Sequence, residues 1–210
     1  MVRGLPNILH RDERIIVLDK PTGLLSVPGI GPEKADCLAA RVSAAFPGAR
    51  NVHRLDRDTS GVIVMAFDAE AHRALSVQFQ DRLVEKRYVA VVAGALAEDA
   101  GVIDLPLRKD LDRPPRQMID HERGRPSVTG WRVETRAGDR TRLDLAPLTG
   151  RSHQLRLHLA TIGHPILGDD LYAPPDVRAM ADRLLLHALT LAIVHPSTAE
   201  RMTFTAPCPF

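Results

Sequence analysis

Ionisable and hydroxyl side chains are concentrated in the segment HRLDRDTSG, residues 53–61, directly before the apolar run VIVMA. A carboxylate at the mouth of a buried strand can act as a nucleophile or as a base of low basicity. It stays ionised in a partly dry pocket beside a fixed cation, and arginine suits this role because it donates bidentately. We expect Arg156, from a second polar cluster, LTGRSHQLRLH, to be the cation that serves Asp56.

Two structural alternatives compete with catalysis at the first segment. Asp56 and Asp58 can shape a turn by accepting hydrogen bonds from nearby backbone amides, and Thr-Ser-Gly is good turn material before a strand. Spacing alone favours that alternative. An ion pair between Arg54 and an aspartate that fixes the loop is the second alternative. Neither alternative explains the second polar cluster.

Several common chemistries do not fit the sequence. The run GIGP lacks the third glycine of a nucleotide-binding loop, and Pro32 removes an amide that a phosphate would need. The run HRLD differs from the kinase catalytic loop, and neither the glycine-rich loop nor Asp-Phe-Gly is present. His153 and His158 are five residues apart, off the helical spacing of paired metal ligands, while Ser60 and Ser152 lie in no nucleophile elbow. The remaining possibility is a site centred on a carboxylate, without metal or cofactor.

Charge is distributed unevenly along the chain. The net charge of +2 over 210 residues does not by itself indicate a polyanionic partner. However, no Asp or Glu occurs between Leu145 and Gly168, a stretch that contains Arg151, Arg156 and three histidines. Such a stretch suits a phosphate-facing surface, although an arginine-rich composition is an alternative explanation.

The chain has the composition of a cytoplasmic globular protein. With 44% hydrophobic residues it can bury a sizeable core, and we expect one domain over 1–210. Cys37 and Cys208 are far apart and have neither metal nor redox spacing, which fits a reducing compartment. The first apolar run is broken by charges before a signal peptide forms, and no apolar stretch reaches the roughly 20 residues that span a bilayer.

Short strands and three helices must position these side chains. Asp68 is expected to cap a helix that runs to about Arg82, and Ser152 a helix that Gly163 ends, with Leu155, Leu159 and Ile162 inward. The polar, proline-containing stretch 108–126 is predicted to be a loop or irregular arm. The order of elements predicts an α+β domain around a largely antiparallel sheet. The remaining expected helix is 34–46, and the expected strands are 8–10, 15–19, 61–67, 86–94, 101–107, 128–135, 141–147, 184–196 and 202–207.

Four motifs in series resemble one enzyme family. HRLDRDTSG, KRYVAVVAG, LTGRSHQLRLHLATIGHPILGDDLY and LLLHALTLAIVHP are similar, in order and spacing, to the motifs of the RluA-type pseudouridine synthases. The opening run DKPTGLLSVPG belongs to the same pattern, so the resemblance covers essentially the whole chain. It implies the pseudouridine synthase fold, a mixed and mostly antiparallel sheet with flanking helices and loops. It also implies a single catalytic domain without an S4 domain.

The resemblance assigns roles to individual residues. It implies that Asp56 is the catalytic carboxylate, that Tyr88 stacks on the target uracil, and that Arg156 is the partner of the aspartate. It further implies that Arg54 enters the RNA where the target base has left. The remaining expected substrate-binding residues are His53, Thr59, Arg151, His153 and Leu186. For Arg151 and His153 a surface-charge role, and for Leu186 core packing, are the alternatives.

The C-terminal stretch, from PPDVRAM to MTFTAP, is especially similar to the dual-specificity members of the family. This similarity implies that the partners are 23S ribosomal RNA and tRNA, whose anticodon stem-loop carries the second target. We expect a monomer that needs no cofactor and no metal, and no membrane partner. A single RNA target, a binding module or RNA chaperone on a retired catalytic fold, and a glycosidase with paired Asp56 and Asp58 are the rival hypotheses.

Overall fold

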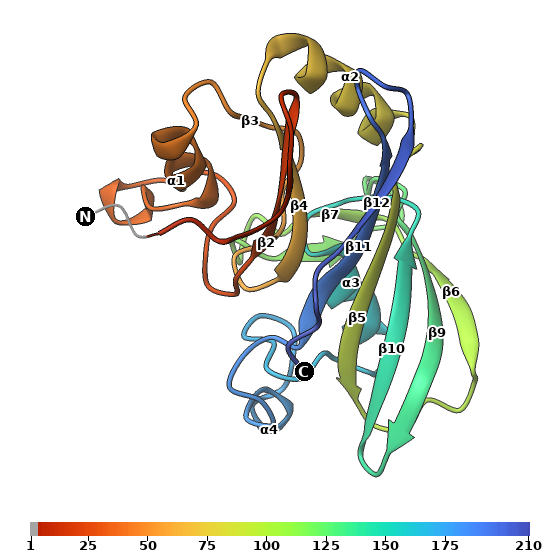
Figure 1. Cartoon of the computed structure of the whole chain (residues 1–210). Coiled ribbons are helices and arrows are strands. Elements are labelled where there is room, and N and C mark those ends of the chain that lie inside the picture. The colour runs from red at the N-terminus through yellow and green to blue at the C-terminus, as the bar shows by residue number, and fades with distance from the viewer. Residues whose placement is uncertain (1–3) are drawn as a thin grey trace. The chain divides into compact units, whose positions relative to one another are not determined.

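The structure is a computed structural model that describes residues 4–210 and divides into two compact units. Unit 1 comprises the chain up to Lys86 together with His187–Pro209, and unit 2 comprises Arg87–Leu186 and Phe210. Both units combine strands with helices (Figure 1), as the α+β prediction requires. In residues 4–210 no helix is long and apolar enough to cross a membrane.

Unit 1 is built around strand β4, whose seven residues are all buried. Its sheet has the order β1–β2–β4–β11, while β3 also pairs with β4 and β12 pairs with β11. The β4–β11 pair is parallel and the other pairs are antiparallel, so the sheet is mixed. The strands of this sheet are β1 (Asn7–Arg11), β2 (Ile15–Lys20), β3 (Arg50–Asn51), β4 (Ser60–Ala66), β11 (Leu186–Val194) and β12 (Arg201–Thr205).

Two helices complete unit 1. The second, α2 (Ala69–Gln80), begins where Asp68 accepts a hydrogen bond from the amide of Ala71 at 2.8 Å, as predicted. Its apolar side chains Ala71 and Leu75 pack into a core with Val62, Val64 and Leu191. The first, α1 (Leu38–Ala45), begins later than the predicted position 34, because residues 32–34 form a 3-10 turn and the Sγ atom of Cys37 caps the helix.

Gly61 allows β4 to approach β11 directly after the polar motif. Its φ is +115°, and a Cβ atom at this position would lie 2.1 Å from the carbonyl oxygen of Ala188. A side chain is therefore excluded by both backbone conformation and space. The glycine that ends the motif permits the close parallel pairing of Ser60 and Gly61 with His187 and Ala188.

Unit 2 contains an antiparallel sheet of order β5–β10–β9–β6. Its core gathers Val92, Leu143, Leu145, Leu159 and Ile166. The helices are α3 (Gln154–Thr161), which was predicted, and the short α4 (Pro175–Arg178), which was not. The strands of the sheet are β5 (Glu85–Ala93), β6 (Ala100–Asp104), β9 (Val128–Ala137) and β10 (Arg140–Pro147).

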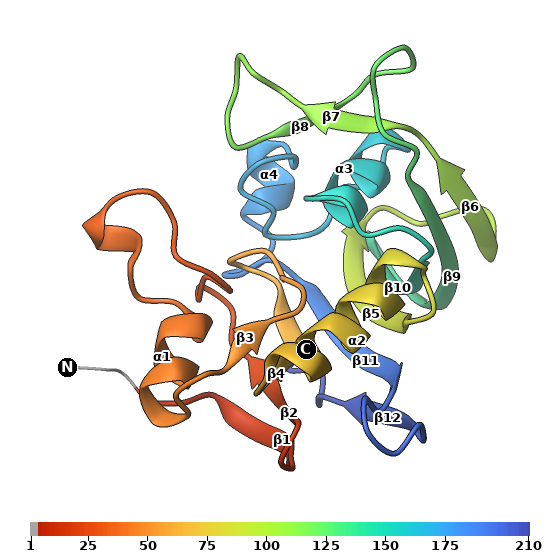
Figure 2. The same cartoon turned by 90° about the horizontal axis from the view of Figure 1, so that it is seen from above.

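The stretch 108–126 is more regular than predicted, and the irregular-arm prediction is wrong for its first half. Strands β7 (Leu107–Lys109) and β8 (Gln117–Ile119) form a two-stranded hairpin, which we call the β7–β8 arm. Ion pairs between Arg108 and Asp120 and between Arg113 and Asp110 stabilise it. Figure 2 shows the arm, with α3 and α4 in the same unit. The charged residues that predicted a loop instead form ion pairs with one another within the arm.

Candidate active site

The polar motif forms the loop between β3 and β4, and a buried lysine holds it. The Lys20 side chain has no exposed surface, although lysine is rarely buried. Its ammonium donates to the carbonyl oxygens of Pro21 at 2.9 Å, Leu24 at 2.7 Å and Arg57 at 3.0 Å. An ammonium group has three hydrogens to donate. One cation thus joins the turn after β2 to the middle of the motif loop.

Two hydroxyl groups fix the same loop on either side of Asp56. Thr22 Oγ1 donates to the carbonyl oxygen of Asp58 at 2.7 Å. Ser26 Oγ donates to the carbonyl oxygen of Leu55 at 2.7 Å and accepts from the amide of Leu55 at 3.0 Å. The run DKPTGLLSVPG therefore supplies the scaffold of the loop. These roles could not be predicted from the sequence, because buried donors to backbone carbonyls leave no spacing signal.

The carboxylates of Asp56 and Asp58 differ in their contacts within the described residues. Asp56 is half-buried, and within the described part of unit 1 its carboxylate accepts no hydrogen bond. Asp58, in contrast, accepts from Arg57 Nε at 2.9 Å and from Arg57 Nη2 at 2.9 Å. No backbone amide of unit 1 donates to either side chain among the described residues, so the turn-shaping alternative is wrong. The loop is instead held by Lys20, Thr22 and Ser26.

Arg54 is exposed, and within the described part of unit 1 it forms no ion pair. The alternative in which Arg54 pairs with an aspartate to fix the loop is therefore not supported in unit 1. A long cationic side chain beside Asp56, held by no acid of its own unit, is suited to contact with RNA. Its insertion into the RNA stays a prediction.

His53 faces the interior of unit 1. Its ring stacks on Phe79 with centroids 4.4 Å apart and planes 21° apart, and its Nε2 accepts from the amide of Val64 at 3.2 Å. Burial, with a smaller contribution from the positive charge of Lys86, lowers the pKa of His53 to about 3. This geometry makes His53 an anchor of the loop on β4, and its expected contact with substrate stays a prediction.

We expect His53 to remain neutral at every pH at which the protein is active. Because its folded-state pKa lies below the ordinary value of 6.5, its contribution to stability is present above pH 6.5 and is lost as the pH falls toward 3. A histidine NMR titration should give a pKa near 3 for His53. A midpoint near 6.5 would show that the ring is solvated and does not anchor the loop.

Thr59 and Ser60 lead the loop into β4. Thr59 is 2% exposed, and its Oγ1 is buried without a hydrogen-bond partner in the described chain. An unsatisfied buried hydroxyl costs free energy, and a bound substrate atom would relieve that cost. Ser60 Oγ lies 2.8 Å from His187 Nδ1, and His187 Nε2 donates to the carbonyl oxygen of Ala206 at 3.1 Å. The His187 tautomer is thereby fixed, with Ser60 as the donor to Nδ1.

Unit 2 contains the other predicted site residues. Tyr88 is half-buried on β5, opposite Leu145 of β10, and its ring packs against the core of this unit. Leu186 is 3% exposed and is a member of that core, as the core-packing alternative expects. Their contacts with uracil stay predictions.

Arg156 is 2% exposed and is held by two acids of its own unit. Its Nε donates to Asp169 Oδ2 at 2.8 Å, and its Nη2 donates to Asp169 Oδ1 at 2.5 Å and to Asp170 Oδ1 at 2.8 Å. Asp169 has no exposed surface and also accepts from the amides of Leu171 and Tyr172. Sequence reasoning missed both acids, which come immediately after the acid-free stretch in the quoted motif run GDDLY.

A buried polar network orders the segment before Arg156. Gln154 Oε1 accepts from Thr149 Oγ1 at 2.7 Å and from the amide of Arg151 at 3.0 Å, while its Nε2 donates to Thr129 Oγ1 at 3.0 Å. His158 Nδ1 lies 2.9 Å from the same Thr129 hydroxyl, and burial lowers the pKa of His158. The backbone of Arg151 is therefore fixed, while its expected contact with RNA stays a prediction.

The start of α3 differs from the prediction. The N-cap residue is His153, which adopts a left-handed conformation with φ 54° and ψ 16°, and Ser152 is not the cap. Leu155 and Leu159 are buried as predicted, but Ile162 is 37% exposed, because the helix ends at Thr161. A left-handed conformation in a residue other than glycine costs free energy and marks a constrained position.

The predicted site residues thus fall into two groups. Unit 1 contains His53, Arg54, Asp56 and Thr59 on one loop, and unit 2 contains the five others. The pairing of Asp56 with Arg156 joins residues of different units and stays a prediction. In the described residues, no group of three His, Cys, Asp or Glu side chains is arranged to hold a metal ion.

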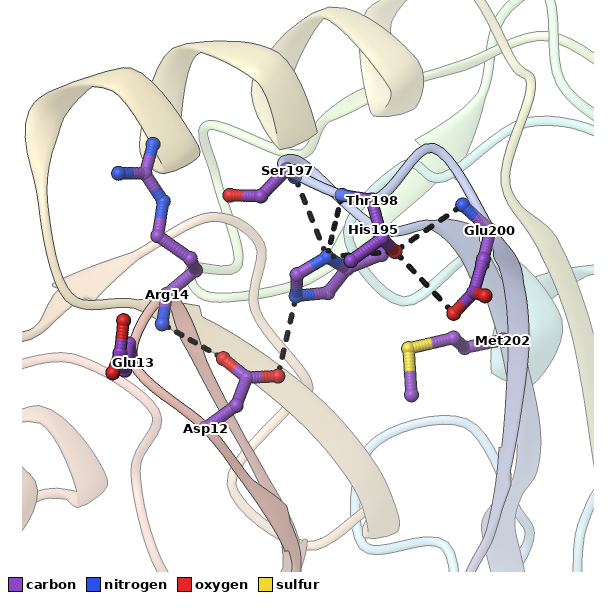
Figure 3. A pocket seen from close by; sticks show the side chains of 8 residues that line it. All are labelled: Asp12, Glu13, Arg14, His195, Ser197, Thr198, Glu200 and Met202. Carbon is purple, nitrogen blue, oxygen red and sulfur yellow. Dashed lines mark hydrogen bonds and ion pairs between the residues drawn. The ribbon is translucent and has the colours of Figure 1, made fainter.

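A cavity of about 510 Å³ in unit 1 contains none of the predicted residues (Figure 3). Thr198, His195 and Asp12 there have the composition of a hydrolase triad. However, His195 Nδ1 accepts from the amides of Ser197 and Thr198 at 3.3 and 3.1 Å, so the ring cannot act as a base toward the hydroxyl. The group closes the turn between β11 and β12.

Comparisons with known proteins identify the family. The sequence profile described as RNA pseudouridylate synthase matches residues 14–161. A curated relative from Yersinia pestis, named dual-specificity RNA pseudouridine synthase RluA, is 49% identical over 204 residues, 97% of this chain and 99% of the relative. A relative of the same name from Pasteurella multocida is 47% identical, over 97% of this chain and 94% of its own.

Solved structures agree with the sequence comparisons. Human RNA Pseudouridylate Synthase Domain Containing 1 superposes with a TM-score of 0.82 at 30% identity, over 100% of this chain and 86% of the human chain. Human RNA Pseudouridylate Synthase Domain Containing 4 has a TM-score of 0.78 and, at 24% identity, supports the fold alone. The predicted fold class and enzyme class are confirmed. The chain belongs to the RNA pseudouridylate synthase family and is an isomerase that converts uridine in RNA to pseudouridine.

Proposed function

We propose that this enzyme modifies a uridine in 23S ribosomal RNA and a uridine in the anticodon stem-loop of tRNA, with Asp56 as the catalytic carboxylate. The observation that carries the assignment of Asp56 is its half-buried side chain, without a partner in the described part of unit 1, on a loop clamped by Lys20. The dual specificity is supported by relatives of that name, which the chain matches over nearly their whole length. We place the enzyme in the cytoplasm, as a monomer.

The reaction is an isomerisation that is balanced without a co-reactant. The C1′–N1 bond of the uridine breaks, the uracil turns, and a C1′–C5 bond forms. The hydrogen leaves C5 as a proton, and N1 of the new nucleotide gains one. Asp56 acts as nucleophile or base in this sequence, because a weakly basic carboxylate can attack and then leave.

The target base must leave its stack to reach Asp56. Extrusion costs a few kcal/mol and costs less in a loop than in a duplex, which fits an anticodon stem-loop as substrate. Stacking on Tyr88 offsets part of this cost, by roughly 1 to 3 kcal/mol. Arg54 occupies the place that the base vacates. Arg156, oriented by Asp169, is the cation that keeps Asp56 ionised.

Two synthetic RNAs test the specificity. We expect the purified protein to form pseudouridine in a tRNA anticodon stem-loop and in a 23S rRNA stem-loop, each detected by carbodiimide-dependent reverse-transcription stops. Matched RNAs with cytidine at the target position are the controls. Conversion of only one RNA would establish the single-target alternative, and binding of both RNAs without conversion would indicate a retired catalytic fold.

A further inference from the structure

Tyr172 contacts three segments of unit 2 that are distant in sequence. Its hydroxyl accepts from the amide of Gln117 in β8 at 2.8 Å and lies 2.8 Å from Nδ1 of His153. Its ring lies 5.5 Å from the guanidinium carbon of Arg156 and 5.9 Å from that of Arg116. One half-buried side chain thus joins the β7–β8 arm to the N-terminal end of α3.

One hydrogen bond at this hydroxyl has a fixed direction. A backbone amide can only donate, so the oxygen of Tyr172 accepts from Gln117, and its own proton is available to His153 Nδ1. When Tyr172 donates this bond, the neutral imidazole carries its ring proton on Nε2. The His153 ring also meets the Tyr172 ring edge-on, with centroids 5.7 Å apart and an angle of 78°. Tyr172 therefore orients the ring of His153 through one hydrogen bond and one ring contact.

Tyr172 is itself held by the acid that holds Arg156. Asp169 Oδ1 accepts from the amide of Tyr172 at 3.0 Å and from Nη2 of Arg156 at 2.5 Å. The aromatic ring adds a cation–π contact to the same guanidinium. A displacement of Tyr172 would consequently be transmitted to Arg156 through one carboxylate and through one ring.

The arm needs an external tie. Its strands pair over three residues each, and an isolated two-stranded hairpin is marginally stable in water. Leu107 is bonded to Arg125 at the base of the arm, while Gln117, opposite Lys109 at the end of the ladder, is bonded to Tyr172. The turn beyond that point exposes Leu111 and Arg113, which suits contact with RNA.

We infer that Tyr172 is a positioning residue through which the β7–β8 arm sets His153 and Arg156 for RNA substrates. The inference rests on the proposed function, since it takes RNA as the ligand of the arm. When RNA binding shifts the arm, Tyr172 moves with it. The hydroxyl of Tyr172 then shifts His153, and Asp169 shifts Arg156. Tyr172 touches no reacting atom and acts through these neighbours.

The variant Tyr172→Phe keeps the ring and removes both hydrogen bonds. We expect kcat/KM for the anticodon stem-loop to fall by about 10-fold, as the loss of two neutral hydrogen bonds implies. Hydrogen exchange at the Gln117 amide in the protein without RNA should rise by about 10-fold for the same reason. In a His153→Ala background, Tyr172→Phe should lower kcat/KM by a smaller factor, about 3-fold, because only the bond to Gln117 remains to be lost.

The matched control is Thr161→Val, which removes an exposed hydroxyl from α3 that donates only within the helix, to the carbonyl oxygen of Leu157. It should leave kcat/KM and Gln117 exchange unchanged. Unchanged exchange in Tyr172→Phe, or an equal loss of kcat/KM with and without His153, would overturn the inference. Absence of conversion by the wild-type protein would instead overturn the proposed function, so the two failures are distinguishable.

Discussion

Replacement of Asp56 by Asn is expected to reduce uridine conversion by about 10,000-fold or more, the scale at which loss of a nucleophile acts. The amide keeps the size of the side chain but can neither attack nor accept a proton at neutral pH. The Asp56 carboxylate accepts no hydrogen bond within the described part of unit 1, so folding stability should change little. Single-turnover conversion of the anticodon stem-loop measures the first effect, and thermal unfolding measures the second.

The matched control lies two residues away on the same loop. Asp58→Asn removes the ion pair with Arg57, whose side chain is 55% exposed. Exposed ion pairs contribute about 1 kcal/mol or less, so conversion should stay within about fivefold of the wild-type rate. If both variants lost activity equally, the loop would matter as a structure and Asp56 would not be its reacting group.

Replacement of Asp169 by Ala is expected to lower the free energy of unfolding by about 3 to 5 kcal/mol, because it leaves the guanidinium of Arg156 buried and poorly compensated. The amides of Leu171 and Tyr172 lose their acceptor in the same variant. Urea denaturation followed by circular dichroism measures the change. Conversion should also fall in the folded protein, since Arg156 loses the carboxylate that orients it.

Asp170→Ala provides the comparison for this variant. Asp170 contacts the same Arg156 nitrogen at 2.8 Å, but its side chain is 35% exposed. Because water can replace this partly exposed partner, its removal should lower the free energy of unfolding by about 1 kcal/mol. If Asp170→Ala destabilised the protein as much as Asp169→Ala, the buried position of Asp169 would not be the source of its effect.

Strands and helices were predictable where one physical signal dominated. The apolar run of β4 and the Asp68 cap of α2 are local features, and both elements lie where the sequence places them. The start of α3 was not predictable, because its N-cap residue is His153 in a left-handed conformation, with its ring in contact with Tyr172, nineteen residues further along the chain. The β7–β8 arm was missed because its stability comes from paired charges and a distant hydroxyl.

The residue types of the site were predictable, but their interaction partners were not. Asp56 was predicted from its motif, and the absence of a partner for its carboxylate in the described part of unit 1 agrees with the proposed chemical role. Lys20 could not be found from the sequence, because its function is to donate to backbone carbonyls, which every residue has. Arg156 was expected to be the cation that serves Asp56, which stays a prediction, and its acids, Asp169 and Asp170, lie beyond the acid-free stretch in which it was found.

Tritium release from an anticodon stem-loop labelled at C5 of its uridines tests the central claim most directly. Isomerisation moves the glycosidic bond to C5, so we predict that one tritium is released for each pseudouridine formed and that no free uracil appears. Asp56→Asn should release no tritium and form no pseudouridine. Free uracil without tritium release would show a glycosidase. Tritium release by Asp56→Asn at the wild-type rate would show that another group performs the reaction.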